Sequence, residues 1–271
     1  MTAATKPSRI ADHFADLASQ DRKALAPYVT IGHPEKESTL EVVPALVEGG
    51  ATMIELGIPF SDPLADGPTI QRSGFKALQN GVTMKYCMET ARELRNRGVE
   101  VPLIFMGYFN PILRYGLQRF VSDCAEAGVD GLIIPDLPPD ESAELAEICK
   151  AHQRDLIFMV APTSREQHIQ ALNGQASGFV YCVSITGVTG ARADVSSDLS
   201  AFLGRVRNAL DLPLAVGFGI STPEHVREVG AYADGAIVGS ALISRLDEAD
   251  PADVATVARD FMRYLRGEAS G

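Results

Sequence analysis

The segment TMIELG, residues 52–57, is a short run of apolar residues interrupted by one acid, Glu55. Similar runs occur at residues 27–32, 103–108, 131–136, 156–162, 178–184, 214–219 and 235–240. They are too continuously apolar for strands with one face in water, which is typical of a parallel sheet covered by helices. Amphipathic stretches separate the runs, so the sequence predicts a (β/α)8 TIM barrel with its active site at the carboxyl ends of the strands.

The chain length sets the expected number of domains. With 271 residues and 46% hydrophobic composition, the chain can bury one large core, so residues 1–271 are expected to form a single barrel domain. An extra helix is predicted at residues 8–19, and residues 1–7 and 267–271 are expected to be flexible. A doubly wound open sheet is the alternative fold, but TIGHPEK, residues 30–36, lacks the G-x-G-x-x-G turn that usually follows the first strand of such a sheet.

Charge and composition exclude several classes of partner. The formal net charge of −11 would repel nucleic acid and anionic membranes. The amino-terminal MTAATKPSRI has no apolar segment of the kind found in secretory signals, and no apolar run is long enough to span a bilayer. The four cysteines are far apart, which predicts reduced core residues and not a zinc site or a disulfide framework. We therefore expect a cytoplasmic protein without a nucleic-acid or membrane partner.

Two of the predicted loops are unusually long, and both follow the carboxyl ends of strands. They cover residues 58–69 and 185–195, whereas most such connections have about two to six residues. In a barrel, catalytic groups gather at this end of the strands. The second loop, ITGVTGARADV, is rich in glycine and small residues, as is typical of a lid that closes over substrate or of a flexible loop.

Glu55 and Asp66 are the acids that need an explanation. Glu55 lies in an apolar strand, where a carboxylate either makes a structural ion pair or hydrogen bond or transfers protons with a pKa raised by burial. Asp66 lies in PLADGP, residues 63–68, where it forms either an Asx turn before Gly67 or a second acid/base group. Two carboxylates in different environments can supply an acid and a base at the same pH.

Glycines after the last three predicted strands indicate a phosphate site. Backbone N–H groups at the corresponding loops of a barrel, and at the start of a short helix, can approach a phosphate closely. A single glycine of this kind would be read as a turn or packing residue, but the set favours phosphate binding. Its members are Gly187, Gly190, Gly217, Gly219 and Gly239, the last followed by Ser240.

Missing residues exclude several reaction types. All six lysines lie outside the predicted strands, which argues against a Schiff-base lysine and against pyridoxal-phosphate chemistry in this chain. The histidines are scattered, so no metal site is expected. No G-x-S-x-G, H-E-x-x-H or P-loop motif occurs. The remaining prediction is metal-free acid/base chemistry on a phosphorylated small molecule.

Several segments together closely resemble the tryptophan synthase α subunit family, in order from about residue 8 to residue 266. The resemblance implies a lyase that cleaves indole-3-glycerol phosphate into indole and glyceraldehyde 3-phosphate. It implies no cofactor in this chain and a pyridoxal-phosphate-bearing β subunit as partner, in an allosteric α2β2 complex that makes tryptophan. The segments are ELGIPFSDPLADGPTIQ (55–71), NPILRYG (110–116), PDLPPDE (135–141), TGVTGAR (186–192), GFGIS (217–221) and VGSA (238–241).

The resemblance also implies roles for individual residues. The acid/base residue of the family corresponds to Glu55, and the aspartate that engages the indole nitrogen corresponds to Asp66. Thr189 corresponds to the lid residue that closes on Asp66, and Asp62 and Asp136 to residues that link to the β subunit. For the indole wall, ordinary core packing is the competing explanation. The implied phosphate contacts are Gly190, Phe218, Gly219, Gly239 and Ser240, and the implied indole wall is Tyr28, Met106, Ile133, Tyr181 and Phe218.

Three other functions are compatible with parts of the sequence. A lyase acting alone would release free indole and would not respond to a β subunit. A catalytically silent barrel that only activates a partner would not need Glu55 or Asp66. An isomerase of sugar phosphates would not need an aromatic wall.

Overall fold

The described part of the chain confirms the predicted (β/α)8 fold. The computed structural model describes residues 8–183, 192–217 and 219–268, so the expected flexible ends fall mostly outside it. Within these residues, eight parallel strands form a closed barrel in chain order, and β8 pairs with β1. The strands are β1 (Ala24–Thr30), β2 (Ile54–Gly57), β3 (Leu103–Met106), β4 (Gly131–Ile133), β5 (Asp155–Val160), β6 (Val180–Val183), β7 (Leu214–Gly217) and β8 (Gly235–Val238).

The strands end earlier than their apolar runs. The run at 131–136, for example, continues beyond the last residue of β4, Ile133, and the run at 103–108 continues beyond Met106. Except in the run at 52–57, which ends with β2 at Gly57, the final residues of these runs lie beyond the strands. Tyr108, which the sequence places in a strand, therefore lies in a loop beside the cavity described below.

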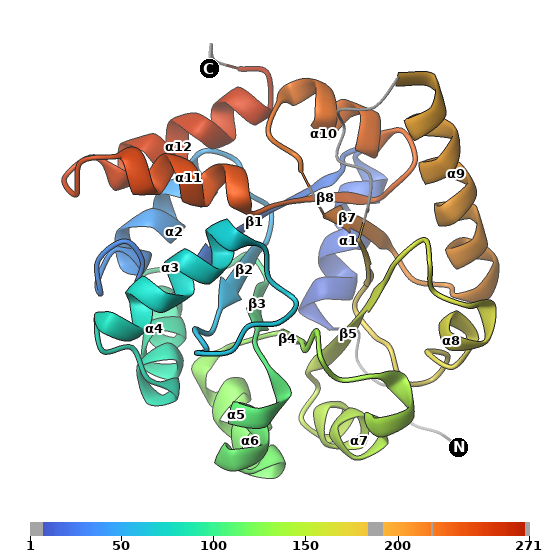
Figure 1. The fold of residues 1–271 in the computed structure, drawn as a ribbon, viewed down its shortest axis with the longest axis horizontal. Helices are drawn as coiled ribbons and strands as arrows, with labels where there is room; N and C mark the ends of the chain where they lie inside the picture. The colour runs from blue at the N-terminus through green and yellow to red at the C-terminus, as the bar shows by residue number, and fades with distance from the viewer. Residues whose placement is uncertain (1–7, 184–191, 218, 269–271) are drawn as a thin grey trace.

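Helices surround the strands (Figure 1). The connections after β2, β3 and β8 each contain two α-helices, where a simple alternation would place one. The helices are α1 (Arg9–Ser19), α2 (Thr39–Glu48), α3 (Pro68–Gln79), α4 (Met84–Asn96), α5 (Phe109–Tyr115), α6 (Leu117–Ala127), α7 (Ala143–Ala151), α8 (Glu166–Gln170), α9 (Arg192–Ala209), α10 (Pro223–Gly230), α11 (Ser240–Glu248) and α12 (Val254–Leu265), with the 3-10 helix η1 (Pro139–Glu141) before α7.

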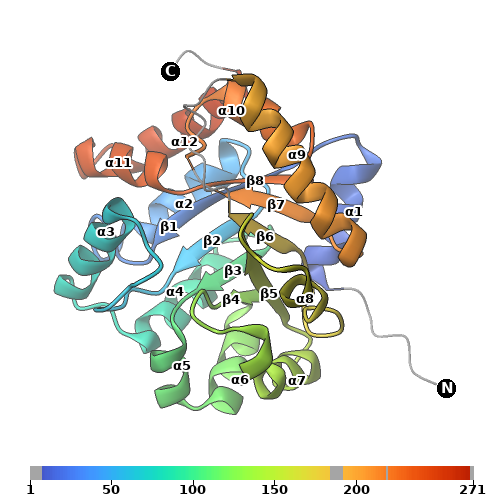
Figure 2. The same cartoon turned by 45° about the vertical axis from the view of Figure 1, so that its right-hand side comes forward.

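The extra helix α1 covers the amino end of the barrel, apart from the surrounding helices (Figure 2). Its Ser8 side chain accepts a hydrogen bond from Ala11 N, which begins the helix at the predicted place. Its apolar face carries Ile10, Phe14 and Leu17 into the cluster that fills the barrel interior. The rings of Phe14 and Phe179 lie 5.7 Å apart. The interior of the barrel is thus a packed core, and α1 closes it at the amino ends of the strands.

A clasp, meaning a pair of hydrogen bonds between a leucine and a polar residue, repeats at the amino ends of four strand pairs. In each pair, a leucine at the start of an odd-numbered strand donates its N–H to a side-chain oxygen located just before the next strand. The same leucine accepts the backbone N–H of that residue, so each pair of strands is closed by two bonds. The bonds measure 2.8 to 3.1 Å and join Leu25 to Thr52, Leu103 to Asp130, Leu156 to Ser177 and Leu214 to Asp234.

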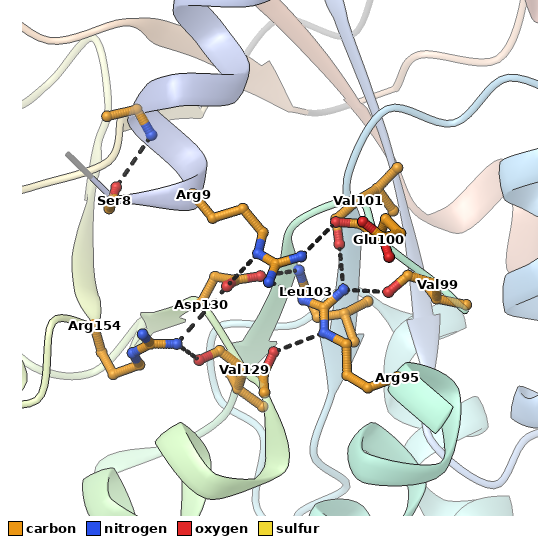
Figure 3. A network of polar contacts seen from close by, with 12 residues as sticks. Ser8, Arg9, Arg95, Val99, Glu100, Val101, Leu103, Val129, Asp130 and Arg154 are labelled. Carbon is orange, nitrogen blue, oxygen red and sulfur yellow. Dashed lines mark hydrogen bonds and ion pairs between the residues drawn. The ribbon is translucent and has the colours of Figure 1, made fainter. Parts of the chain in front are cut away.

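The clasp at Asp130 is reinforced by three arginines (Figure 3). Asp130 is 4% exposed, and its Oδ2 accepts hydrogen bonds from Arg95 Nη2 at 2.6 Å and Leu103 N at 2.9 Å. Its Oδ1 lies 3.2 Å from Arg9 Nε and 3.7 Å from Arg154 Nη1. These arginines come from α1, α4 and the segment before β5, so one carboxylate joins elements far apart in sequence.

The cysteines are core residues, as predicted. Cys87, Cys124 and Cys149 lie on helices and Cys182 on β6, and all are free and buried. Among the helices of the described residues, none combines the length and the apolar character needed to cross a membrane.

Candidate active site

A cavity of 510 Å³ opens at the carboxyl ends of the strands. Its size is within the usual range for small-molecule sites, about 300–1,000 Å³. Its lining combines the two acids noted in the sequence with apolar and small side chains. The lining residues are Tyr28, Glu55, Ala65, Asp66, Gly67, Ile70, Met106, Met159, Tyr181, Val183, Gly217, Gly219, Ile220, Ser221, Ile237, Gly239, Ser240, Ala241 and Ser244.

Glu55 is a buried acid of β2 that faces the cavity. The strand register places it between Tyr28 of β1 and Ile104 of β3, and it is 2% exposed. Within the described residues, its Oε1 has no hydrogen-bond partner. Burial, and secondly the negative charge of Asp66, raises the pKa of Glu55 to about 8. The described residues give this oxygen no hydrogen bond, so they do not support the alternative interpretation of Glu55 as a structural residue.

Asp66 lies in the loop between β2 and α3 and also faces the cavity. Its N–H donates to Pro63 O at 3.1 Å, and Gln71 Nε2 donates to its carbonyl oxygen at 2.8 Å, so the backbone on both sides is held. Burial raises the pKa of Asp66 to about 6, and the Tyr108 hydroxyl acts against this rise. Asp66 is therefore the more acidic of the two groups.

The two environments give the carboxyls different protonation states at neutral pH. Glu55, with a pKa of about 8, holds its proton, whereas Asp66, with a pKa of about 6, is mostly ionised. One group can therefore donate a proton while the other stabilises positive charge. This combination serves a reaction in which a substrate is protonated at one atom and becomes electron-poor at another.

Tyr108 is a site residue that the sequence reading missed. Its hydroxyl accepts a hydrogen bond from Ala65 N at 3.0 Å, directly before Asp66, and its ring lies 5.4 Å from that of Phe60. The next residue, Phe109, donates its N–H to Asp136 Oδ1 at 2.8 Å. Tyr108, in the loop that follows β3, therefore holds the loop that carries Asp66. Its position at the end of the apolar run at 103–108, where catalytic groups of a barrel gather, could have identified it from the sequence.

Small residues form the side of the cavity at β7, β8 and α11. Gly219, Gly239 and Ser240 all line it, and Gly219 has a φ of 71°, which favours glycine. Ser240 is the first residue of α11, whose first-turn N–H groups begin at the cavity. A helix start of this kind suits an anion. Gly190 and Phe218, also predicted to contact phosphate, and Thr189, predicted to close on Asp66, lie outside the described residues, as does most of the expected lid.

The predicted indole wall is only partly at the cavity surface. Tyr28, Met106 and Tyr181 line the cavity, but Ile133 is 1% exposed and lies in the interior cluster beneath it. Met159 lines the cavity although the sequence reading did not select it. An apolar residue of a buried strand gives no sign of which layer of the barrel it occupies.

Each wall tyrosine lies against a glycine of the next strand. A Cβ at Gly57 would clash with the Tyr28 hydroxyl, and one at Gly217 would clash with the Tyr181 hydroxyl. The absence of these two side chains leaves room for the tyrosine hydroxyls. Tyr28 is held further because its hydroxyl lies 3.3 Å from Thr30 Oγ1, which is 2.6 Å from Ser73 Oγ of α3.

Asp62 and Asp136, predicted to link to a partner, are both exposed at the carboxyl end of the barrel. Asp62 belongs to the same loop as Asp66, and Asp136 accepts the hydrogen bond from Phe109 N. The described residues contain no group of three or more His, Cys, Asp or Glu side chains arranged to hold a metal ion.

Comparisons with known proteins agree with this geometry. Residues 14–267 match the family model described as tryptophan synthase alpha chain. The tryptophan synthase alpha chain of Roseiflexus sp. (strain RS-1) is 56% identical over 96% of this chain and 100% of its own length. That of Chloroflexus aggregans is 55% identical over 95% of this chain and 97% of its own.

Solved structures show the same similarity. Tryptophan synthase subunit alpha from Legionella pneumophila has a TM-score of 0.90 and 36% identity, covering 97% of this chain and 98% of its own. A chain of Mycobacterium tuberculosis tryptophan synthase has a TM-score of 0.87 at 36% identity, again covering 97% and 98%.

Proposed function

The chain belongs to the tryptophan synthase alpha chain family, and we propose that Glu55 and Asp66 carry out the reaction of this family in the cavity at the carboxyl ends of its strands. It is a carbon–carbon lyase of tryptophan biosynthesis that cleaves indole-3-glycerol phosphate into indole and glyceraldehyde 3-phosphate. The observation that carries the proposal is the buried Glu55, whose Oε1 has no hydrogen-bond partner among the described residues, in the same cavity as Asp66. Their pKa values of about 8 and about 6 suit an acid and an ion at neutral pH.

The proposed reaction begins with a proton transfer from Glu55. Protonation of the indole ring at C3 makes the ring accept electrons, and positive charge develops at its N–H. Asp66 stabilises this charge as an ion that is largely shielded from water. The Glu55 carboxylate formed in the first step then removes the proton of the glycerol hydroxyl next to C3. The carbon–carbon bond breaks, its electrons return to the ring, and the aldehyde and indole separate.

The phosphate group is proposed to bind on the side of the cavity formed by β7, β8 and α11. Gly219, Gly239 and Ser240 supply backbone N–H groups and a hydroxyl there without a lysine, which suits a protein of net charge −11. Gly190 and Phe218 remain proposed contacts, and Thr189 remains the proposed partner of Asp66 on closure. Tyr28, Met106 and Tyr181 are proposed to enclose the indole, while Ile133 would support this wall from beneath.

Indole leaves this chain for a β subunit, the partner of the family. We propose an α2β2 complex with pyridoxal phosphate held by the β subunit and no cofactor in this chain. Asp62 and Asp136 are proposed to contact the partner, because both are exposed beside the loops that form the site. We further propose that residues 1–271 act as one barrel domain and that the complex is cytoplasmic.

One assay tests these assignments. The purified chain is incubated with indole-3-glycerol phosphate, indole is measured, and the measurement is repeated with β subunit. Glu55→Gln should abolish indole release while a glycerol-phosphate analogue still binds, and near-normal turnover would contradict the role of Glu55. Strong activation by β subunit supports the complex, whereas high activity that β subunit does not change would favour a lyase acting alone. Activation of the partner by a chain without turnover would indicate a silent activator.

A further inference from the structure

Two thioether side chains form one side of the cavity floor. Met106 is the last residue of β3, and Met159 lies on β5. Both line the cavity, and both are partly buried where they pack on the cluster that fills the barrel interior. They therefore belong to the layer between the substrate space and the closed core, together with Tyr181 and Ile237.

The strand between them leaves a gap in this layer. No residue of β4 (Gly131–Ile133) is among the described residues that line the cavity. Ile133, the last residue of β4, is 1% exposed and belongs to the interior cluster below. Met106 and Met159, on the strands that flank β4, are thus the cavity-lining residues of this part of the barrel among the described residues.

The position of the floor identifies the part of the substrate that rests on it. Gly239 and Ser240 place the phosphate end at β8 and α11, and Glu55 and Asp66 place the reacting carbon and the ring nitrogen near β2. In a closed barrel of eight strands in chain order, β4 lies opposite β8. The benzene edge of the indole, the part farthest from the phosphate, therefore points toward Met106 and Met159.

The chemistry of methionine differs from that of the other walls. An unbranched side chain with three rotatable bonds can move aside for a larger group, and its sulfur makes favourable contacts with aromatic rings. Tyr28 and Tyr181, in contrast, are each fixed against a glycine of the next strand. The cavity thus has an adaptable side at the benzene edge, in contrast with the side formed by Tyr28 and Tyr181.

We propose that this lyase accepts indole-3-glycerol phosphates carrying substituents on the benzene ring, and that Met106 and Met159 determine this tolerance. The proposal rests on the proposed function, because it needs the indole in this cavity. A rigid apolar pocket discriminates against one added methyl group by roughly 10- to 200-fold. A floor that adapts should reduce this penalty to about threefold.

The first measurement needs no mutation. The values of kcat/KM are compared for indole-3-glycerol phosphate and its 5-methyl, 6-methyl and 2-methyl derivatives. The 5- and 6-methyl compounds should retain at least about a third of the parent value, whereas the 2-methyl compound, whose methyl lies on the pyrrole edge near Glu55 and Asp66, should lose at least about tenfold. A loss above about tenfold for both benzene-ring derivatives would overturn the proposal.

The second measurement assigns the tolerance to the methionines. Met106→Ile and Met159→Ile replace each flexible side chain with a branched one of similar size, and each should lower the ratio of 5- or 6-methyl to parent kcat/KM by about tenfold. Met106→Leu and Met159→Leu are milder replacements in case the isoleucine variants fold poorly. Met84→Ile, at the start of α4 and remote from the cavity, should leave the ratio unchanged.

The outcomes separate this inference from the proposed function. An unchanged ratio in all four floor variants would overturn the role of Met106 and Met159. Turnover of the parent compound without turnover of its 5- and 6-methyl derivatives would overturn the tolerance alone. No turnover of the parent compound by the wild-type chain would overturn the proposed function, and this inference with it.

Discussion

Glu55 near the carboxyl ends of the strands and Asp130 at the amino end of β4 are buried to a similar degree, with 2% and 4% of their surfaces exposed. Their surroundings differ completely. Asp130 has three arginines within 3.7 Å and the N–H of Leu103 on one oxygen. Glu55 has an oxygen without any hydrogen-bond partner among the described residues. The neighbouring charge that shifts its pKa is that of another acid, Asp66.

This difference shows how one fold separates stability from chemistry. At the amino end, the Asp130 carboxylate is paired with arginines from three elements and with the N–H of Leu103, so it holds the barrel together. At the carboxyl end, a charge is left unbalanced, and the proton that neutralises it becomes available to a substrate. Neutralising the two side chains without changing their shape should therefore have opposite effects on stability.

The largest effect is expected for Asp130→Asn. The amide removes the charge that Arg9, Arg95 and Arg154 share, and its NH2 group cannot accept their hydrogen bonds. Because Arg9 is half exposed but Arg95 is mostly buried, we expect the free energy of unfolding to fall by about 2–4 kcal/mol. Urea denaturation measures this change. Indole formation by the folded variant should stay within about twofold of wild type, since the site lies at the other end of the barrel.

The matched change at the other end, Glu55→Gln, should stabilise the protein. The pKa of Glu55 rises from 4.5 to about 8 on folding, so its ionisation lowers the stability of the folded state progressively between these two pH values. Glutamine does not ionise, and the variant should gain roughly 1–3 kcal/mol at pH 8 and about zero at pH 4.5. Urea denaturation at both pH values provides the check. Equal or lower stability at pH 8 would mean that Glu55 is compensated in the folded protein.

A smaller effect is expected from Tyr108→Phe. The change removes the hydroxyl that accepts the Ala65 N–H and that lowers the pKa of Asp66. The pKa of Asp66 should then rise above about 6, so the acid limb of the profile of kcat/KM against pH moves to higher pH, and kcat/KM at neutral pH should fall by about tenfold.

Tyr115→Phe is the control for this change. The Tyr115 hydroxyl, at the end of α5, donates a hydrogen bond to Asp123 of α6. Neither residue lines the cavity. Loss of the Tyr115 hydroxyl should leave the profile of kcat/KM against pH unchanged. If Tyr108→Phe lowers activity equally at every pH, then Tyr108 shapes the loop without affecting the ionisation of Asp66.

The two ends also differ in how well the sequence predicts them. Glu55 is visible because a single acid in an apolar run contradicts its surroundings. Asp66 and the glycines of the phosphate site are visible because they follow the carboxyl ends of predicted strands, and the resemblance then implied their individual roles. Asp130, in contrast, stands before a strand, where an aspartate is typical of a turn. Its arginines come from α1, α4 and the segment before β5, and only the closed barrel brings them together.

The residues whose place in the site the sequence alone does not show are of ordinary type. Tyr108 and Met159 read as strand residues, and Ile133 reads as a wall residue, because all belong to apolar runs. Whether such a side chain faces the core, the cavity or a loop depends on where its strand ends and on its stagger against its neighbours. Strand offsets in a barrel arise from closure and not from local sequence.

The smallest effect should come from a clasp without charge, at Thr52. Its Oγ1 accepts the Leu25 N–H at 2.9 Å, as Asp130 accepts that of Leu103, but no arginine reinforces it among the described residues. Thr52→Val keeps the shape and removes the acceptor, leaving the buried N–H of Leu25 unpaired, so the free energy of unfolding should fall by about 1–2 kcal/mol. Thr52→Ser, which keeps the hydroxyl, should recover most of this loss in the same denaturation experiment. If Thr52→Val destabilises the protein as much as Asp130→Asn, then the clasp itself, and not the arginine cluster, accounts for the stability of the amino end.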